Sequence, residues 1–385
     1  MPLFRRRSGG EGGEGGGSGQ GTGGAEAARG RSGLRGLGRG LGLGFGRRAA
    51  GDAAPAPRLD PTFGDPAVRL LLEQAAAGDW AALRPALAAR IDGAAAATGA
   101  TDTPATSTST ATAPDAAELS WLVGAIADVP GVEQWTARAV ADAPEDPLPL
   151  LVSGARHVSW AWEARTGARA NKVTEEQWKL FHQRLDVAEE QLLEVAEREP
   201  GWLAPWYFLQ ISARGASLGP EIATCRFEAA VRRSPGHLGS HQQRLQQLCA
   251  KWGGSHDAMH GFARSAMLAA PEGSRLGELV ALAHLEHWLD LPDGEDRAYL
   301  TSPAVLAELQ EAAFRSVLHP AFVPDRGWQG SFNTFAMAFS LADQPKTARL
   351  LFDALDGQVT EFPWQYLSGD PVKAFRAHRD RCAAY

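Results

Sequence analysis

Three pairs of histidines at helical spacing are the residues of this chain best suited to chemistry. They are His237 with His241, His256 with His260, and His284 with His287. Side chains three or four residues apart share one face of a helix, which is the arrangement a zinc site needs. The pairs would form one site if the packing of neighbouring helices brought their faces together. No HExxH motif is present, and Glu286 lacks the spacing of a general base.

Two interpretations of these histidines stay open. In the commoner one they are hydrogen-bonded side chains of a helical core. In the other, His256, His260, His284 and His287 hold a metal ion or serve a small-molecule enzyme. We predict no cofactor, no metal and no catalytic residue, and these four histidines are the candidates if that prediction is wrong.

Twelve tryptophans are many for a chain of 385 residues. They could line an aromatic groove for a ligand or peptide, or they could fill the gaps between helices with each indole N–H bound to a carbonyl. Packing is the interpretation we favour. Trp252 differs from the others because Gly253 and Gly254 after it predict a loop, where it would close a helix end or contact a ligand.

The net charge of −7 is distributed unevenly. Residues 1–50 contain nine arginines and three glutamates, which leaves a charge of −13 on the rest of the chain. An acidic body argues against nucleic-acid binding by the folded part. Residues 1–57, rich in glycine and arginine, are predicted to form a disordered tail because they cannot bury enough apolar surface to offset the entropy of ordering. A weak electrostatic contact with RNA is the alternative role of this tail.

Other features narrow the class of protein. Neither a GxxxxGK[ST] phosphate loop nor a GxSxG nucleophile elbow occurs. Cys225, Cys249 and Cys382 form no CxxC motif and no even set, which favours free thiols in a reducing compartment. No signal peptide and no run of about 18 apolar residues is visible. We therefore expect a cytoplasmic protein without a membrane span.

Apolar residues recur at helical spacing through most of the chain. The strongest helix is predicted over residues 174–199, where Thr174 and Gln177 form a capping box. Stretches with a period of two are missing, so the predicted class is all-α. The predicted domains are an N-terminal helical pair at residues 58–92, a linker rich in alanine and threonine at 93–114, and a helical-repeat domain at 115–385.

A repeat organises the second half of the chain. Residues 225–275 predict the end of one helix, a helical hairpin whose second helix is capped by Ser255, and the start of the next helix. Pro200, Pro235 and Pro271 stand 35 and 36 residues apart, close to the roughly 34-residue period of tetratricopeptide arrays. Proline suits the first turn of a helix, so we expect each to start a new hairpin. The predicted fold is a tetratricopeptide-like α-solenoid of stacked antiparallel hairpins.

Residues 251–255, with the sequence KWGGS, and the helix after them resemble the central signature of a bacterial family, domain of unknown function 4034. The helix residues that carry the resemblance are Met259, Phe262, Ala263 and Arg264. Residues 333–364, which end in Phe-Pro-Trp, are similar to the end of that family. The likeness covers roughly residues 65–385 apart from the linker. It implies a tetratricopeptide-like helical fold, and it supplies no activity, cofactor or site residue.

Stacked hairpins favour recognition over catalysis, because they leave an extended concave surface. We predict a non-catalytic scaffold that binds an unknown protein or peptide, and the histidine-based enzyme is the alternative. The expected contact residues are polar side chains of first helices together with the loop tryptophan: Gln210, Arg214, Gln242, Arg244 and Trp252.

Overall fold

The computed structural model describes residues 55–98, 116–166 and 172–385. The tail before residue 55 and most of the predicted linker lie outside these residues. Within them the fold is all-α, as predicted, and the strands are two short segments, β1 (Arg58–Leu59) and β2 (Gln358–Val359). No helix in these ranges is both long enough and apolar enough to cross a lipid bilayer.

The helices follow one another with short connections. Their bounds are α2 (Pro66–Ala77), α3 (Trp80–Thr98), α4 (Ala116–Ala127), α5 (Val132–Asp142), α6 (Pro147–Arg165), α7 (Glu175–Arg198), α8 (Ala204–Gly215), α9 (Pro220–Arg233), α10 (Leu238–Leu248), α11 (His256–Ala269), α12 (Glu278–Asp290), α13 (Glu295–Leu300), α14 (Pro303–Arg315), α15 (Trp328–Leu341), α16 (Pro345–Leu355) and α17 (Pro371–Ala383). The described residues also contain the 3₁₀ helices η2 (Ala250–Trp252), η3 (Arg275–Gly277) and η4 (Trp364–Tyr366). Helix α3 continues past Gly93, where we expect the linker to begin.

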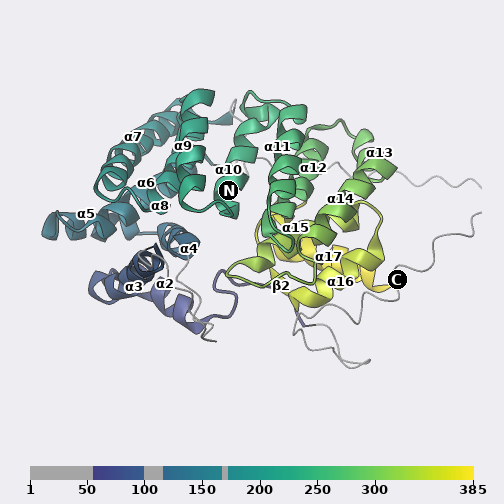
Figure 1. Ribbon diagram of the computed structural model, residues 1–385, viewed down its shortest axis with the longest axis horizontal. Coiled ribbons are helices and arrows are strands. Elements are labelled where there is room, and N and C mark those ends of the chain that lie inside the picture. Colours follow the sequence, from purple (N-terminus) through teal and green to yellow (C-terminus); the bar gives the residue numbers. More distant parts are fainter. Residues whose placement is uncertain (1–54, 99–115, 167–171) are drawn as a thin grey trace, which may run out of the picture.

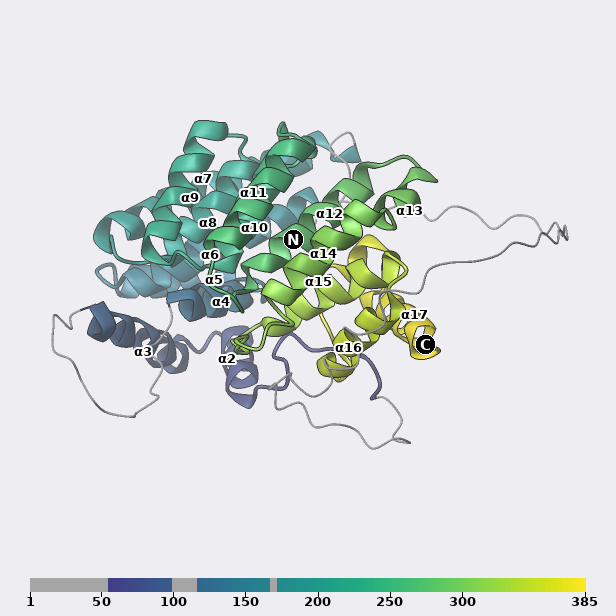
Figure 2. The same cartoon turned by 45° about the vertical axis from the view of Figure 1, so that its right-hand side comes forward.

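The helices pair into hairpins that stack in chain order (Figure 1). Helix α6 packs on α7, α8 on α9, α10 on α11, and α15 on α16. The first helices of successive hairpins also contact one another: α6 contacts α8, α8 contacts α10, α10 contacts α12, and α12 contacts α15. In Figure 2 the helices from α7 to α15 run side by side across the molecule. The chain is therefore a helical-repeat array in which each hairpin buries its apolar face against the next.

The three prolines of the repeat lie between successive hairpins, as predicted: Pro200, Pro235 and Pro271. They do not start the next helix, however, because α8, α10 and α12 begin further along the chain. At α10 the first amides are capped instead by His237, whose Nδ1 accepts a hydrogen bond from the Ser240 backbone N–H at 3.2 Å. The prolines therefore mark the loops between hairpins, and the expectation that they form first turns is wrong.

The turn within the central hairpin needs both of its glycines. Gly253 has a φ of 87°, in the left-handed region that favours glycine. A Cβ on Gly254 would lie 2.0 Å from the Leu248 carbonyl oxygen. Ser255 then caps α11, because its hydroxyl oxygen accepts a hydrogen bond from the Ala258 N–H at 3.1 Å. The cap predicted from the sequence is confirmed.

Two hydrophobic cores lie along the array. Helices α2 to α8 surround the first, and helices α10 to α17 surround the second. Trp252 packs against both cores, so it lies where they meet. This position predicts that changes at Trp252 reach both halves of the molecule.

The N-terminal and C-terminal parts of the described chain are joined. Strand β1 pairs in parallel with β2, and Arg379 donates to the Pro55 carbonyl at 2.9 Å. Arg326, just before α15, forms ion pairs with Asp65 at 2.8 Å and with Glu118 at 3.0 Å. The N-terminal helical pair therefore packs into the same body as the repeats, and the end of the predicted tail is part of the fold (Figure 1).

Candidate metal centre

Helices α11 and α12 carry the four histidines singled out above. Helix α11 begins at His256, directly after its Ser255 cap, and places His260 one turn further along the same face. Helix α12 packs on α11 and carries His284 and His287. It is buried on nearly all sides, as its apolar sequence predicts. The helix ends therefore fix which turns of the two helices face each other.

The faces of the two pairs converge. The His256 and His287 rings stack, with 3.9 Å between centroids and 6° between planes. His260 Nε2 lies 3.2 Å from His287 Nδ1, and the His260 and His284 ring centroids are 4.7 Å apart. The convergence that a shared site requires is therefore present.

Two further side chains complete what we call the histidine cluster, which consists of the four histidines with Tyr299 and Glu308. Tyr299 comes from α13, and its hydroxyl lies 2.8 Å from His284 Nδ1 and 3.3 Å from His260 Nε2. Glu308 comes from α14, and its carboxylate lies 3.1 Å from His284 Nε2. His284 thus has a polar partner at each ring nitrogen.

Burial favours the neutral form of His260, His284 and His287. Loss of solvent, reinforced by the neighbouring histidines, lowers the pKa of both His260 and His284 to about 4. The pKa of His287 is lowered by burial and by His256. The pKa of the Tyr299 hydroxyl is raised by burial and by the Glu308 carboxylate. At neutral pH the imidazoles of His260 and His284 are therefore unprotonated, which is the form that binds a metal ion.

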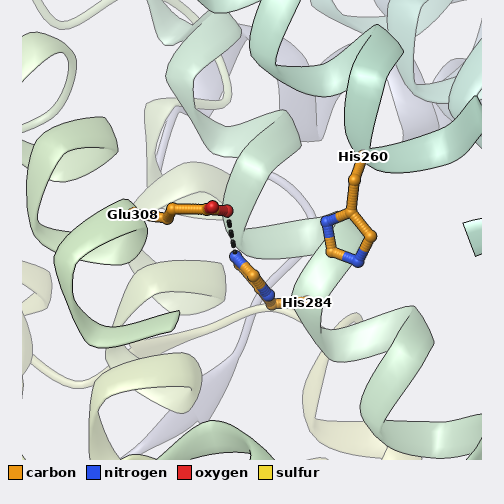
Figure 3. Close-up of side chains that lie close together, drawn as sticks. All are labelled: His260, His284 and Glu308. Carbon is orange, nitrogen blue, oxygen red and sulfur yellow. Dashed lines mark hydrogen bonds and ion pairs between the residues drawn. The ribbon is translucent and has the colours of Figure 1, made fainter. Parts of the chain in front are cut away.

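Three of these side chains point toward one another from three different helices (Figure 3). One ligand atom each of His260, His284 and Glu308 lies within 4.8 Å of the other two. Two imidazoles and a carboxylate are a ligand set that zinc and other first-row divalent metals accept. In a tetrahedral zinc site, ligand atoms stand roughly 3.4 Å apart. A small inward movement of these side chains would therefore suffice to hold an ion.

The cluster has both a rigid side and an accessible side. His284 is 3% exposed, whereas the Glu308 side chain is 45% exposed. His284 is therefore fixed by packing, and Glu308 can adjust and also provides a path for an ion from solvent. No local signal marks Glu308 or Tyr299, because they lie on other helices than the histidines. The packing of α13 and α14 brings them to the cluster.

The predicted contact residues of the first helices do not form an open surface. Gln210 and Arg214 are buried, at 6% and 4% exposed. Gln210 donates to the Ser240 hydroxyl at 3.1 Å, and Gln242 donates to the Glu278 carboxylate at 3.0 Å. Arg244 is half-buried. The expectation that Gln210 and Arg214 face an exposed groove is corrected, because they are buried. Gln242 and Arg244 are partly exposed, and their role as contact residues stays a prediction.

Trp252 lies in the 3₁₀ helix η2, and the glycine turn begins only after it. Its indole ring meets the Trp162 ring edge-on, with 6.0 Å between centroids. Trp252 is half-buried and contributes to both cores. Closing the helix end and packing are therefore its observed roles.

Comparison of the chain with protein-family models, with curated proteins and with solved structures found no match. The resemblance to the domain of unknown function 4034 family therefore stays a prediction.

Proposed function

We propose that this chain is a helical-repeat protein that binds a divalent transition metal, zinc above all, between α11, α12 and α14. The observation that carries the proposal is the approach of His260, His284 and Glu308 to within 4.8 Å of one another. Each comes from a separate helix, so no local turn of the backbone accounts for the approach. Neutral imidazoles and an accessible carboxylate favour a metal of the zinc type over magnesium or calcium.

The number of protein ligands bears on the chemistry. Structural zinc sites use four protein ligands, whereas catalytic sites use three and leave a position for water or substrate. A zinc ion held by three ligands here would supply Lewis acidity and lower the pKa of its bound water. Tyr299 and His287 would orient the ligands, because their polar atoms already contact His260.

Zinc titration of the full chain by calorimetry tests the proposal. We expect one zinc per chain, and a loss of affinity in Glu308→Gln and in His284→Gln larger than the roughly 10–100-fold typical of an outer-shell change. His319→Asn is the matched control, because His319 is a histidine paired with a glutamate, Glu272, at 3.1 Å elsewhere in the array. Equal zinc affinity in all four proteins would refute the proposal.

A protein-binding scaffold is the second function we propose. Apolar side chains that are exposed to solvent favour it: Leu180, Val187 and Leu193 on α7, Leu218 just before α9, and Ile222 in the first turn of α9. Helices α7 and α9 are neighbours, since Arg226 and Glu189 join them at 2.7 Å. Exposed apolar groups on adjacent helices suit a partner of matching apolar surface.

Co-purification from the native cell tests the scaffold. The partner recovered with the wild-type chain should be lost with the double variant Leu193→Glu and Ile222→Glu. Leu268→Glu on α11 is the matched control, because Leu268 is also exposed. Recovery of the same partner with the double variant would contradict this surface.

The state of the cysteines supports a reducing compartment, and we propose the cytoplasm. Cys225, Cys249 and Cys382 are all free. Burial raises the pKa of the Cys249 thiol to about 12, and it also raises the pKa of Cys382. These two thiols are therefore protonated and unreactive at neutral pH.

A further inference from the structure

A second group of buried polar side chains lies where α6, α8 and η2 meet. It consists of Arg165 and Trp162 at the end of α6, Arg214 on α8 and Trp252 on η2, and we call it the arginine–indole cluster. The Arg214 guanidinium carbon lies 5.7 Å from the centre of each indole. The Arg165 guanidinium carbon lies 5.6 Å from Trp162 and 6.0 Å from Trp252. Two cations therefore pack against the same two aromatic rings.

Elsewhere the chain pairs its buried arginines with acids. Arg156 is 1% exposed and contacts Glu133 at 2.7 Å and Glu163 at 2.6 Å. Arg226 is also buried and is held by Glu189. Such pairing is the usual requirement for a buried guanidinium, which cannot lose its proton.

Arg214 departs from that pattern. It is as buried as Arg226, yet across the described ranges its hydrogen-bonding partner is a neutral amide, Gln243 Oε1 at 2.6 Å, and no carboxylate lies within ion-pair distance. Burial lowers the pKa of Arg214 to about 10. The side chain is therefore still charged at neutral pH, without a counter-charge in contact.

Donors without acceptors gather at the same place. Arg214 Nε, Trp162 Nε1 and Trp252 Nε1 are all buried, and none of the three has a hydrogen-bond acceptor within the part of the chain described. Buried N–H groups are normally paired, so three in one cluster call for an explanation. All three are donors. Arg165 adds a second positive charge, and its Nη1 donates to the Thr166 carbonyl at 3.3 Å. The cluster therefore offers only hydrogen-bond donors and positive charge.

We propose that the arginine–indole cluster binds a small oxyanion, a phosphate or carboxylate group, between Arg165 and Arg214 and beside the indole N–H groups of Trp162 and Trp252. Guanidinium groups bind either oxyanion through paired N–H donors, and an ion in a water-poor setting would strengthen both contacts. Trp252 is half-buried and precedes the glycine turn, so it is the side chain past which the ion would enter. This site shares no residue with the metal centre.

Stacking of guanidinium on indole is the competing explanation. A cation over an aromatic face is stabilised without any anion, and Arg184 lies over Trp160 in this way at 3.5 Å. Arg184, however, also donates to the Trp160 carbonyl at 2.6 Å. Arg184 is therefore a comparison within the same protein. Like Arg214 it packs on an indole, but its guanidinium also donates to a carbonyl oxygen.

Calorimetric titration of the full chain tests the proposal. Sodium phosphate and sodium acetate are titrated separately at constant ionic strength, with chloride as the balancing ion. We expect saturable binding of at least one of them at one site per chain, at least 10-fold weaker in Arg214→Gln and unchanged in Arg184→Gln. Saturation by phosphate alone identifies a phosphate site, and saturation by acetate alone identifies a carboxylate site.

A second variant decides the matter if Arg214→Gln does not fold. Trp252→Phe keeps an aromatic ring and removes the N–H, so the better-bound anion should bind several-fold more weakly. Absence of saturable binding by both anions in the wild-type chain would overturn the proposal. So would binding that is the same in wild type, Arg214→Gln and Trp252→Phe.

Discussion

The histidine cluster and the arginine–indole cluster are both buried and polar, and they meet the cost of burial in different ways. His260 and His284 give up their charge, since burial lowers their pKa to about 4. Arg214 keeps its charge at neutral pH, even though burial lowers its pKa to about 10. A neutral imidazole can satisfy its nitrogens with a hydroxyl or a carboxylate, whereas a buried cation also needs a negative partner.

This difference decides which ligand suits each cluster. The histidine cluster presents lone pairs and one carboxylate, Glu308, and therefore suits a cation. The arginine–indole cluster presents donors and positive charge, and therefore suits an anion. The two clusters therefore suit ligands of opposite charge. Both lie between packed helices of the same array, so the difference comes from a few side chains.

The largest expected effect comes from removing a buried arginine that has acidic partners. Arg156→Met leaves Glu133 without its cation, and the free energy of unfolding should fall by about 3–5 kcal/mol. Arg214→Met leaves no carboxylate without its cation, so in chloride buffer the free energy of unfolding should fall by less than about 1 kcal/mol. Urea unfolding followed by circular dichroism measures both. Equal losses would break the distinction between paired and unpaired arginines.

Acid should affect the histidine cluster and leave the arginine–indole cluster unaffected. His284 has a pKa of about 4 in the fold and about 6.5 when unfolded, so the unfolded chain binds more protons between these values. The stabilisation is complete above pH 6.5 and is lost as the pH falls toward 4. For His284 alone we expect the free energy of unfolding to fall by about 2 kcal/mol between pH 7 and pH 5.

Unfolding at several pH values checks this expectation. His284→Gln should make the pH dependence between 7 and 5 shallower, because glutamine does not titrate. A slope that His284→Gln does not alter would place the acid-sensitive groups elsewhere, for example at His237 or His378, whose pKa values are also lowered to about 4.

Much of the fold can be predicted from local signals. The capping box of Thr174 and Gln177 is present with both hydrogen bonds, at 3.2 and 2.9 Å. The Ser255 cap and the joints marked by the repeat prolines are confirmed as well. These features depend on backbone groups a few residues apart. The joining of β1 to β2 could not be predicted, because two-residue strands show no alternation and their partners are distant in sequence.

The sites could be predicted only in part, because contacts between residues distant in sequence leave no local signal. Helical spacing placed His256 with His260, and His284 with His287, on common faces. It could not show that the faces meet, or that α13 and α14 add Tyr299 and Glu308. Polar side chains such as Arg214 were expected at a surface because charged residues are usually exposed, and the stacking of the next hairpin reverses that expectation.

An effect of intermediate size is expected at Tyr299, which we expect to orient the metal ligands without binding the metal itself. Tyr299→Phe removes a hydroxyl that lies 2.8 Å from His284 and 3.3 Å from His260. Because the hydroxyl orients both imidazoles, zinc affinity should fall about 10-fold. Phosphate affinity at the arginine–indole cluster should stay as in the wild type. An unchanged zinc affinity would show that packing alone positions the two histidines.

The smallest expected effect concerns the cap of α11, which supports one cluster more directly than the other. Ser255→Ala removes the acceptor of the Ala258 N–H and should lower the free energy of unfolding by about 1 kcal/mol. His256 and His260 lie in the first turns of α11, where fraying begins, so zinc affinity should fall a few-fold. Arg214 and Trp162 are held by α8 and α6, so the affinity for phosphate or acetate should not change. If both affinities fell together, the two clusters would have to be coupled through η2 and Trp252, which packs against both cores.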